Sequence, residues 1–247
     1  MSGSQKGLAA VAVLGLAVAV YIARMEKPPA PPLQPVPTAA PAAVEAPAFP
    51  LPTLAESDPL VREKAAALFS GARLAEWLKT GSLLRRLTAA VRILAEGGSP
   101  RDALGFLRPT GRFPVKKAAG KVLIDPRGYA RYDAVAGTFA SADAQALAAL
   151  LRAFDPLFRQ ACAELDETCD FRAQLLLAID ELLRVPVVEG DVLLREKVVT
   201  YAFADEALER LSPAQKHLLR MGPKNQAKIQ GKLHELAAAL GAPRQRL

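Results

Sequence analysis

The feature that most constrains this chain is an uncharged run near its N-terminus. Residues 7–23, GLAAVAVLGLAVAVYIA, carry no charged side chain, and Lys6 and Arg24 stand on either side of them. A helix of this length covers roughly 26 Å, which approaches the ~30 Å hydrocarbon core of a bilayer. Tyr21 suits the headgroup level at one end of that helix. We therefore expect residues 1–6 to form a short tail and residues 7–23 to form a single transmembrane anchor.

A cleaved signal peptide is the alternative for the same run. Ala17-Val18-Ala19 fits the small-x-small pattern of a cleavage site. The apolar run continues through Ile22 without a polar region before the cut, which favours a retained anchor. A short N-terminus before a long domain predicts a single-pass protein of a bacterial inner membrane, with its domain in the periplasm.

Residues 24–56 are expected to form a spacer between this anchor and a domain. The stretch PPAPPLQPVPTAAPAAVEAPAFPLPT, residues 28–53, is dense in proline and alanine and nearly free of charge. Such a composition favours extended polyproline conformations, which reach roughly 80 Å over this length. The spacer therefore predicts a partner tens of ångströms from the membrane, either another envelope protein or the cell wall.

The rest of the chain predicts a mainly α-helical domain over residues 57–241, followed by a tail at 242–247. Ser57-Asp58-Pro59 is typical of a helix start, because a side-chain acceptor precedes a proline in the first turn. Apolar side chains then recur at helical spacing, as in Leu83, Leu84, Leu87, Val91 and Leu94.

Later breaks divide the second half of the domain. Ser141 is expected to cap a long helix that Pro156 kinks or splits in two. Gly222-Pro223 makes a sharp turn between two final helices, at about 205–221 and 223–240.

A small β element is expected beside the helices. Phe113-Pro114-Val115 and Val122-Leu123-Ile124 are short β-type runs, which predict a hairpin near 113–124. Residues 192–203, VLLREKVVTYAF, hold β-branched and aromatic side chains and are expected to add a strand to that hairpin.

Four short segments of the chain together resemble a known family. LLRMGPKN (218–225), with RYD (131–133), DPLVRE (58–63) and LLRRL (83–87), resembles a bacterial family catalogued as domain of unknown function 3014. The resemblance covers roughly residues 50–241. It implies an inner-membrane anchor, a proline-rich stretch and a periplasmic domain, and it brings no known activity, ligand or catalytic residue.

Charge is distributed in blocks along the domain. Residues 85–131 carry 11 basic and 3 acidic side chains, residues 132–181 carry 3 and 9, and residues 216–247 carry 7 and 1. The blocks either face each other or water, or they form a basic surface for an anionic partner. The helix start at the Gly-Pro turn, with nearby cations, predicts an anion-binding candidate made of Lys216, Arg220, Lys224 and Asn225. The alternative is that Arg220 and Asn225 bond backbone groups and fix the turn.

A polar cluster beside the predicted hairpin is the other candidate site. It comprises Asp125, Tyr129, Arg131, Tyr132 and Asp133. A pair of carboxylates there could serve acid–base catalysis, although a capped turn with salt links is the favoured interpretation. The sequence holds no GxSxG, P-loop or GxGxxG motif, so no catalytic residue and no cofactor is assigned.

The cysteines and histidines are few. Cys162 and Cys169 would lie ~10.5 Å apart along one continuous helix, too far to bridge. If CAELDETC bends, a disulfide could close in an oxidising periplasm, so a disulfide and two free thiols both stay open. His217 and His234 belong to no metal-binding motif, so no metal site is expected and both are assigned to exposed helix surfaces.

Lys224, Lys228 and Lys232 form a basic stripe on the last helix. No aromatic side chains alternate with them, and a periplasmic domain does not meet DNA, so no nucleic-acid partner is expected. The sequence thus predicts a membrane-tethered interaction or scaffold module without evident catalysis. The alternatives are a hydrolase-like envelope enzyme or a binder of an anionic wall or lipid fragment.

Overall fold

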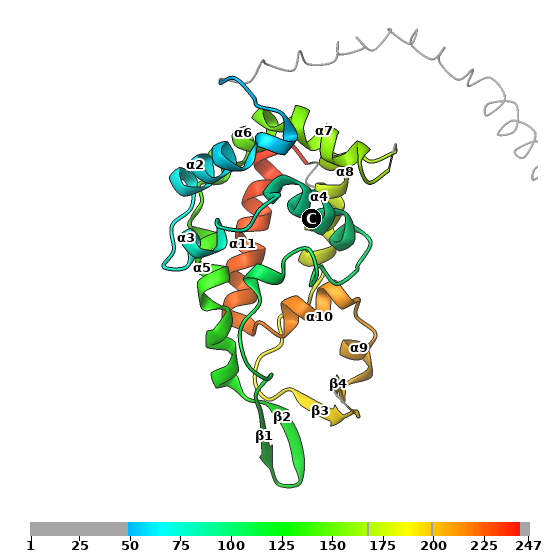
Figure 1. Ribbon diagram of the computed structural model, residues 1–247. Helices are drawn as coiled ribbons and strands as arrows, with labels where there is room; N and C mark the ends of the chain where they lie inside the picture. Colours follow the sequence, from blue (N-terminus) through cyan, green and yellow to red (C-terminus); the bar gives the residue numbers. More distant parts are fainter. Residues whose placement is uncertain (1–48, 167, 199, 243–247) are drawn as a thin grey trace, which may run out of the picture. The chain divides into compact units, whose positions relative to one another are not determined.

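The computed structural model describes residues 49–242, with the exception of residues 167 and 199 (Figure 1). The predicted anchor at 7–23 and most of the predicted spacer lie outside the described residues. Within the described part of the chain, no single helix is long and apolar enough to cross a membrane, and only a pair of helices bent by 77° reaches that length and hydropathy together.

The domain is mainly helical with a small antiparallel four-stranded sheet, which confirms the predicted fold class. In chain order its elements are η1 (Leu54–Glu56), α2 (Asp58–Leu68), α3 (Leu74–Trp77), α4 (Leu83–Ala95), η2 (Gly105–Leu107), β1 (Val115–Ala118), β2 (Lys121–Ile124), η3 (Pro126–Tyr132), α5 (Asp133–Ser141), α6 (Ala144–Ala153), α7 (Asp155–Ala163), α8 (Phe171–Leu183), β3 (Leu193–Glu196), β4 (Tyr201–Phe203), α9 (Glu206–Glu209), α10 (Pro213–Leu219) and α11 (Pro223–Ala239).

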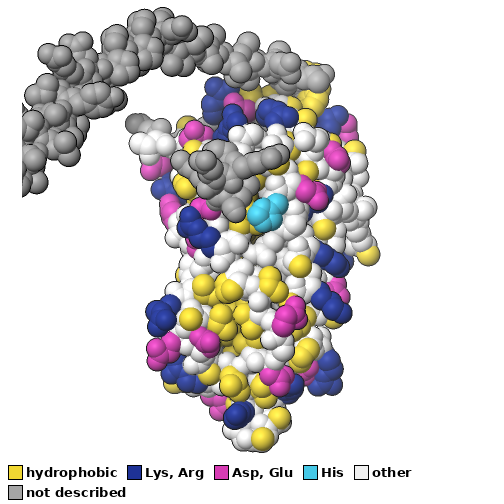
Figure 2. Space-filling model, turned by 180° about the vertical axis from the view of Figure 1, so that it is seen from behind, with side chains coloured by type: hydrophobic (Ala, Val, Ile, Leu, Met, Phe, Trp, Pro, Cys, Tyr) yellow, Lys and Arg dark blue, Asp and Glu magenta, His cyan; other side chains and the backbone are white. Residues whose placement is uncertain are grey.

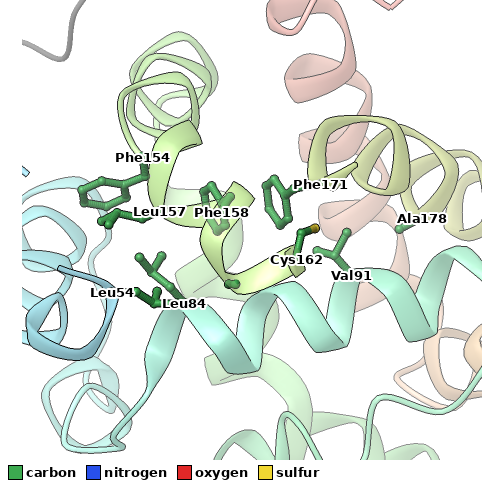
Figure 3. Close-up of a cluster of buried hydrophobic side chains, with 10 residues drawn as sticks. Leu54, Leu84, Val91, Phe154, Leu157, Phe158, Cys162, Phe171 and Ala178 are labelled. Atoms are coloured by element: carbon green, nitrogen blue, oxygen red, sulfur yellow. The ribbon is translucent and has the colours of Figure 1, made fainter. Parts of the chain in front are cut away.

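One hydrophobic cluster joins α4, α7 and α8 (Figure 3). Phe158 and Phe171 stack with their ring centroids 3.7 Å apart, and both are buried. Residues 49–56, which the sequence places in the spacer, also pack here, with Leu54 buried and Phe49 edge-on to Phe154. The folded unit therefore begins upstream of the predicted helix start.

A second cluster surrounds α11, which runs through the middle of the domain against α5, α6 and α8 (Figure 1). Leu233 and Leu236 on this helix and Leu240 directly after it are buried in this cluster. Two glutamines of α11 also bind carbonyl groups at the C-terminal end of α8. Gln226 Nε2 donates to Val185 O (2.9 Å), and Gln230 Nε2 donates to Leu182 O (3.1 Å). Carbonyl groups at a helix C-terminus have no partner within the helix, and these amides supply one.

The sheet has the strand order β1-β2-β3-β4. The hairpin predicted near 113–124 is confirmed as β1 and β2, joined at Ala119-Gly120, where both residues have positive φ. The segment at 192–203 joins this hairpin as predicted, because β3 pairs with β2. It forms two strands rather than one, β3 and β4, around a turn in which Lys197 N–H donates to Thr200 O. Val122, Leu194 and Phe203 pair across neighbouring strands and pack toward α10.

Two helix starts differ from the sequence-based expectation. The Asp58 carboxylate caps α4 rather than its own helix, since Ser82 N–H and Leu83 N–H donate to it at 2.7 and 2.9 Å. Ser141 ends α5, and Asp143 caps α6 by accepting from Ala146 N–H. The split predicted at Pro156 is confirmed, because α7 begins there as a separate helix.

Candidate functional site

The Gly222-Pro223 turn brings two sequence-predicted sets of residues together. Gly222 has φ 83°, and a Cβ at this position would lie 2.4 Å from Tyr129 Cγ, so only glycine fits. Tyr129 is half-buried under this turn, and burial, aided by the charge of Asp191, raises the pKa of its phenol. The turn is therefore fixed against η3 by shape.

Asn225 fixes the same turn by hydrogen bonding. Its side chain is 2% exposed, and Nδ2 donates to Asp133 Oδ1 (2.8 Å), Tyr129 O (3.0 Å) and Met221 O (3.2 Å). The amide thus links one member of the anion-binding candidate to two members of the polar cluster. Its role is the structural alternative that the sequence left open.

The other members of the polar cluster bond elsewhere. Asp125 accepts from the backbone N–H of Arg127 and from its guanidinium, which holds the pKa of that carboxyl below its usual range. Arg131 donates to the carbonyl groups of Thr110, Gly111 and Arg112. Asp125 therefore caps the turn at the start of η3, and Arg131 holds the loop at 110–112 in place through its hydrogen bonds.

A cleft of about 430 Å³ lies beside α10, and the polar cluster does not line it. Its lining comes from the loop after α4 and from α10 itself, namely Ser99, Arg101, Asp102, Pro213, Lys216, His217 and Arg220. Lys216 and Arg220 belong to the predicted anion-binding set, whereas Lys224 and Asn225 lie outside the lining. The remaining lining residues were not predicted.

Backbone bonds and a helix cap fix the two walls of this cleft. Ala214 N–H donates to Gly97 O at 3.0 Å, which holds the start of α10 against the loop after α4. Ser212 and Gln215 form a capping box at the start of α10, and Ser212 Oγ also donates to Glu181. Ser99 Oγ and His217 Nε2 then lie 2.7 Å apart across the cleft wall.

Arg220 is a half-buried cation of the cleft. Its guanidinium lies over the Phe203 ring, 4.8 Å from the centroid, and donates to Tyr201 O and Lys216 O at 3.5 Å each. Among the described residues, no carboxylate oxygen lies within 4.0 Å of it. Burial lowers the pKa of Arg220, the charges of Glu209 and Tyr132 act against that shift, and Arg101 adds a smaller contribution that lowers the pKa.

His217 and Lys216 are the other titratable groups of α10 that line the cleft. Burial lowers the pKa of His217, and the charges of Arg220 and Arg101 lower it further, so this imidazole is neutral at pH 7. The expectation of an exposed histidine is wrong for His217 and holds for His234. Lys216 pairs with Glu209 at 3.4 Å.

The basic block at 85–131 meets the acidic block at 132–181 in two ion pairs away from the cleft. Arg85 forms a two-bond contact with Glu164, and Arg92 contacts Asp166 at 3.5 Å, so the basic and acidic blocks meet between α4 and the end of α7. On the face in Figure 2, charges of both signs intermingle around hydrophobic side chains toward the sheet end. The cleft is thus a local feature rather than part of a broad basic surface.

The two cysteines are bonded to each other. Cys162 and Cys169 form a disulfide with their Cα atoms 5.2 Å apart, across the bend between α7 and α8. In the described part of the chain, no group of three or more histidine, cysteine, aspartate or glutamate side chains is placed to hold a metal ion.

Comparison with known proteins adds one match. A family model described as "Protein of unknown function (DUF3014)" matches residues 83–237, a range that runs from α4 to α11 and includes the cleft and the Gly222 turn. No curated protein and no solved structure matches the chain.

Proposed function

The chain belongs to the DUF3014 family, and from this premise we propose that it is a membrane-tethered, periplasmic binding module of a bacterial envelope. In this proposal residues 7–23 anchor the protein in the inner membrane and the proline-rich spacer carries the domain away from the bilayer. The cleft beside α10 then holds an anionic group of an envelope partner, without evident catalysis.

Two features support the placement. The uncharged run is long enough to span a bilayer, and the stretch that follows it favours extended conformations. The Cys162–Cys169 disulfide is of the kind that persists in oxidising compartments such as the periplasm.

The unpaired state of Arg220 is the observation that carries the binding role. Arginine keeps its charge, and partly burying a charge without a close counterion is costly. The half-buried Arg220 shares the cleft with two further cations and with Asp102, and no carboxylate oxygen of the described residues lies within 4.0 Å of its guanidinium. A guanidinium in this situation favours a carboxylate or phosphate from outside the chain.

Sidedness is tested with reporters fused after Leu247 in the full chain. We expect activity from a reporter that must be exported to function. Activity only from a reporter that requires the cytoplasm would overturn the placement.

Binding is tested by titrating the purified full chain, in detergent micelles, with inorganic phosphate and with succinate at constant ionic strength. We expect Arg220→Gln and the exposed Arg101→Gln each to weaken anion binding at least about tenfold. Lys228→Gln removes an exposed cation of α11 outside the cleft and should leave affinity unchanged. Equal affinity in all four proteins would refute the cleft as the binding site.

A further inference from the structure

We propose that the cleft binds a phosphate monoester and that His217 takes up a proton when the ester binds. This inference rests on the proposed function, because it names the ligand class of the same cleft. The phosphate could belong to a free ester or to a lipid headgroup, since both present the same group.

The donors of the cleft come from two segments, which favours a tetrahedral anion. Ser99 and Arg101 belong to the loop after α4, whereas Lys216 lies on α10 and Arg220 directly follows it. A carboxylate offers two oxygens in one plane, but a phosphate monoester offers three acceptor oxygens that face different walls. The cleft, at about 430 Å³, falls within the size range of small-molecule sites, so it also has room for the group that the ester carries.

The charge balance of the cleft explains why a proton is taken up when the ester binds. The cations of the cleft are Arg101, Lys216 and Arg220, and the anions are Asp102 in the lining and Glu209 on α9 against Lys216. With His217 neutral, three positive and two negative groups leave one net positive charge. A phosphate monoester brings close to two negative charges at pH 7, so one more positive charge would balance it.

His217 is placed to supply that charge. Its Nε2 lies 2.7 Å from Ser99 Oγ. In the neutral Nδ1–H tautomer, Nε2 accepts a hydrogen bond from the Ser99 hydroxyl, whereas a protonated Nε2–H donates to Ser99 Oγ and frees the hydroxyl to donate into the cleft. Protonation therefore adds one positive charge and one donor on the same wall.

The direction of the coupling follows from the neighbours of His217. In the empty cleft, burial and the charges of Arg220 and Arg101 keep its pKa below the ordinary value of 6.5. An anion between these arginines offsets their charges and raises that pKa. Over the pH range in which the ester is a dianion, binding therefore weakens as pH rises through the pKa of His217 in the bound state.

The test is calorimetric titration of the full chain in micelles with glycerol 1-phosphate at pH 7.5, in two buffers of different ionisation enthalpy. At this pH the ester is a dianion, so proton uptake reports the protein. We expect uptake of about one proton in the unmodified chain and none in His217→Gln, which keeps a polar partner for Ser99. Glycerate, a carboxylate on the same carbon skeleton, should bind at least about tenfold more weakly.

Competition in the same micelles identifies the source of the phosphate. Displacement of glycerol 1-phosphate by phosphatidic acid, but not by phosphatidylcholine, supports a lipid headgroup, and binding of the soluble ester without such displacement supports a free ester. Anion binding without a phosphate preference or without proton uptake overturns this inference and leaves the proposed function standing. No binding of phosphate, succinate or the ester overturns both.

Discussion

The two ends of the domain are held together by different kinds of interaction. Around α4, α7 and α8 the interior consists of apolar side chains such as Leu84, Phe158 and Phe171, closed by a disulfide. Around the Gly222 turn, the buried Asn225 and the half-buried Arg220 donate hydrogen bonds to backbone carbonyl groups. Apolar packing tolerates exchange among side chains of similar volume, whereas a buried polar group requires its specific partner. The cleft lies at the end where individual residues matter most.

The largest expected effect tests the apolar end. Phe158→Ala should lower the free energy of unfolding by about 3–5 kcal/mol, because it removes a fully buried ring that stacks on Phe171. Denaturant unfolding of the full chain measures the loss. Leu177→Ala, at a side chain that is 49% exposed on α8, should change it by less than about 1 kcal/mol. Similar losses in both variants would contradict this assignment of the core.

At the polar end, Asn225→Ala should cost about 3 kcal/mol, because it removes three donated hydrogen bonds and leaves buried acceptors without a partner. The adjacent Lys224→Ala serves as the control, since that side chain is exposed. Denaturant unfolding measures both variants. If they proved equally stable, the amide would not be what fixes the turn.

Removing the disulfide by the double change Cys162→Ala and Cys169→Ala should lower the free energy of unfolding by about 2.5 kcal/mol, through the restored freedom of the short loop in the unfolded chain. The result comes from comparing unfolding curves with and without reductant. The unmodified chain should shift on reduction and the double variant should not. A shift in neither would mean that the bond adds nothing to the apolar end.

The smallest effect compares a polar contact at the apolar end with Asn225. Asp58→Ala should cost about 1 kcal/mol, since it removes the carboxylate that caps α4 from α2 in a partly exposed position. Thermal unfolding checks the value against Glu63→Ala, an exposed neighbour whose carboxylate pairs with Lys64. A loss as large as that of Asn225→Ala would remove the distinction between the two ends.

Features that depend on neighbouring residues could be predicted from the sequence. The stripe on α4, the hairpin near 113–124, the join at Pro156 and the Gly222-Pro223 turn all rest on local spacing, and the structure has each of them. The family resemblance rested on such local segments as well, and the match over residues 83–237 confirms it.

Features that depend on distant partners could not be predicted. Asp58 caps a helix that begins 25 residues later, and Ser99 meets His217 across 118 residues, so no spacing signals either contact. The segment at 192–203 has β-forming residues throughout, and its division into two strands depends on pairing β3 with β2. Of the four residues in the predicted anion-binding set, Lys216 and Arg220 line the cleft, because helical spacing places them on the same face of α10.

The most direct measurement of the central claim is hydrogen exchange of the full chain in micelles, with and without inorganic phosphate at constant ionic strength. We expect phosphate to slow hydrogen exchange in the loop at 99–102 and in α10, and in no other described segment. Protection centred on α4 and α8, or no change with phosphate at a concentration that saturates binding, would contradict a ligand site at the cleft.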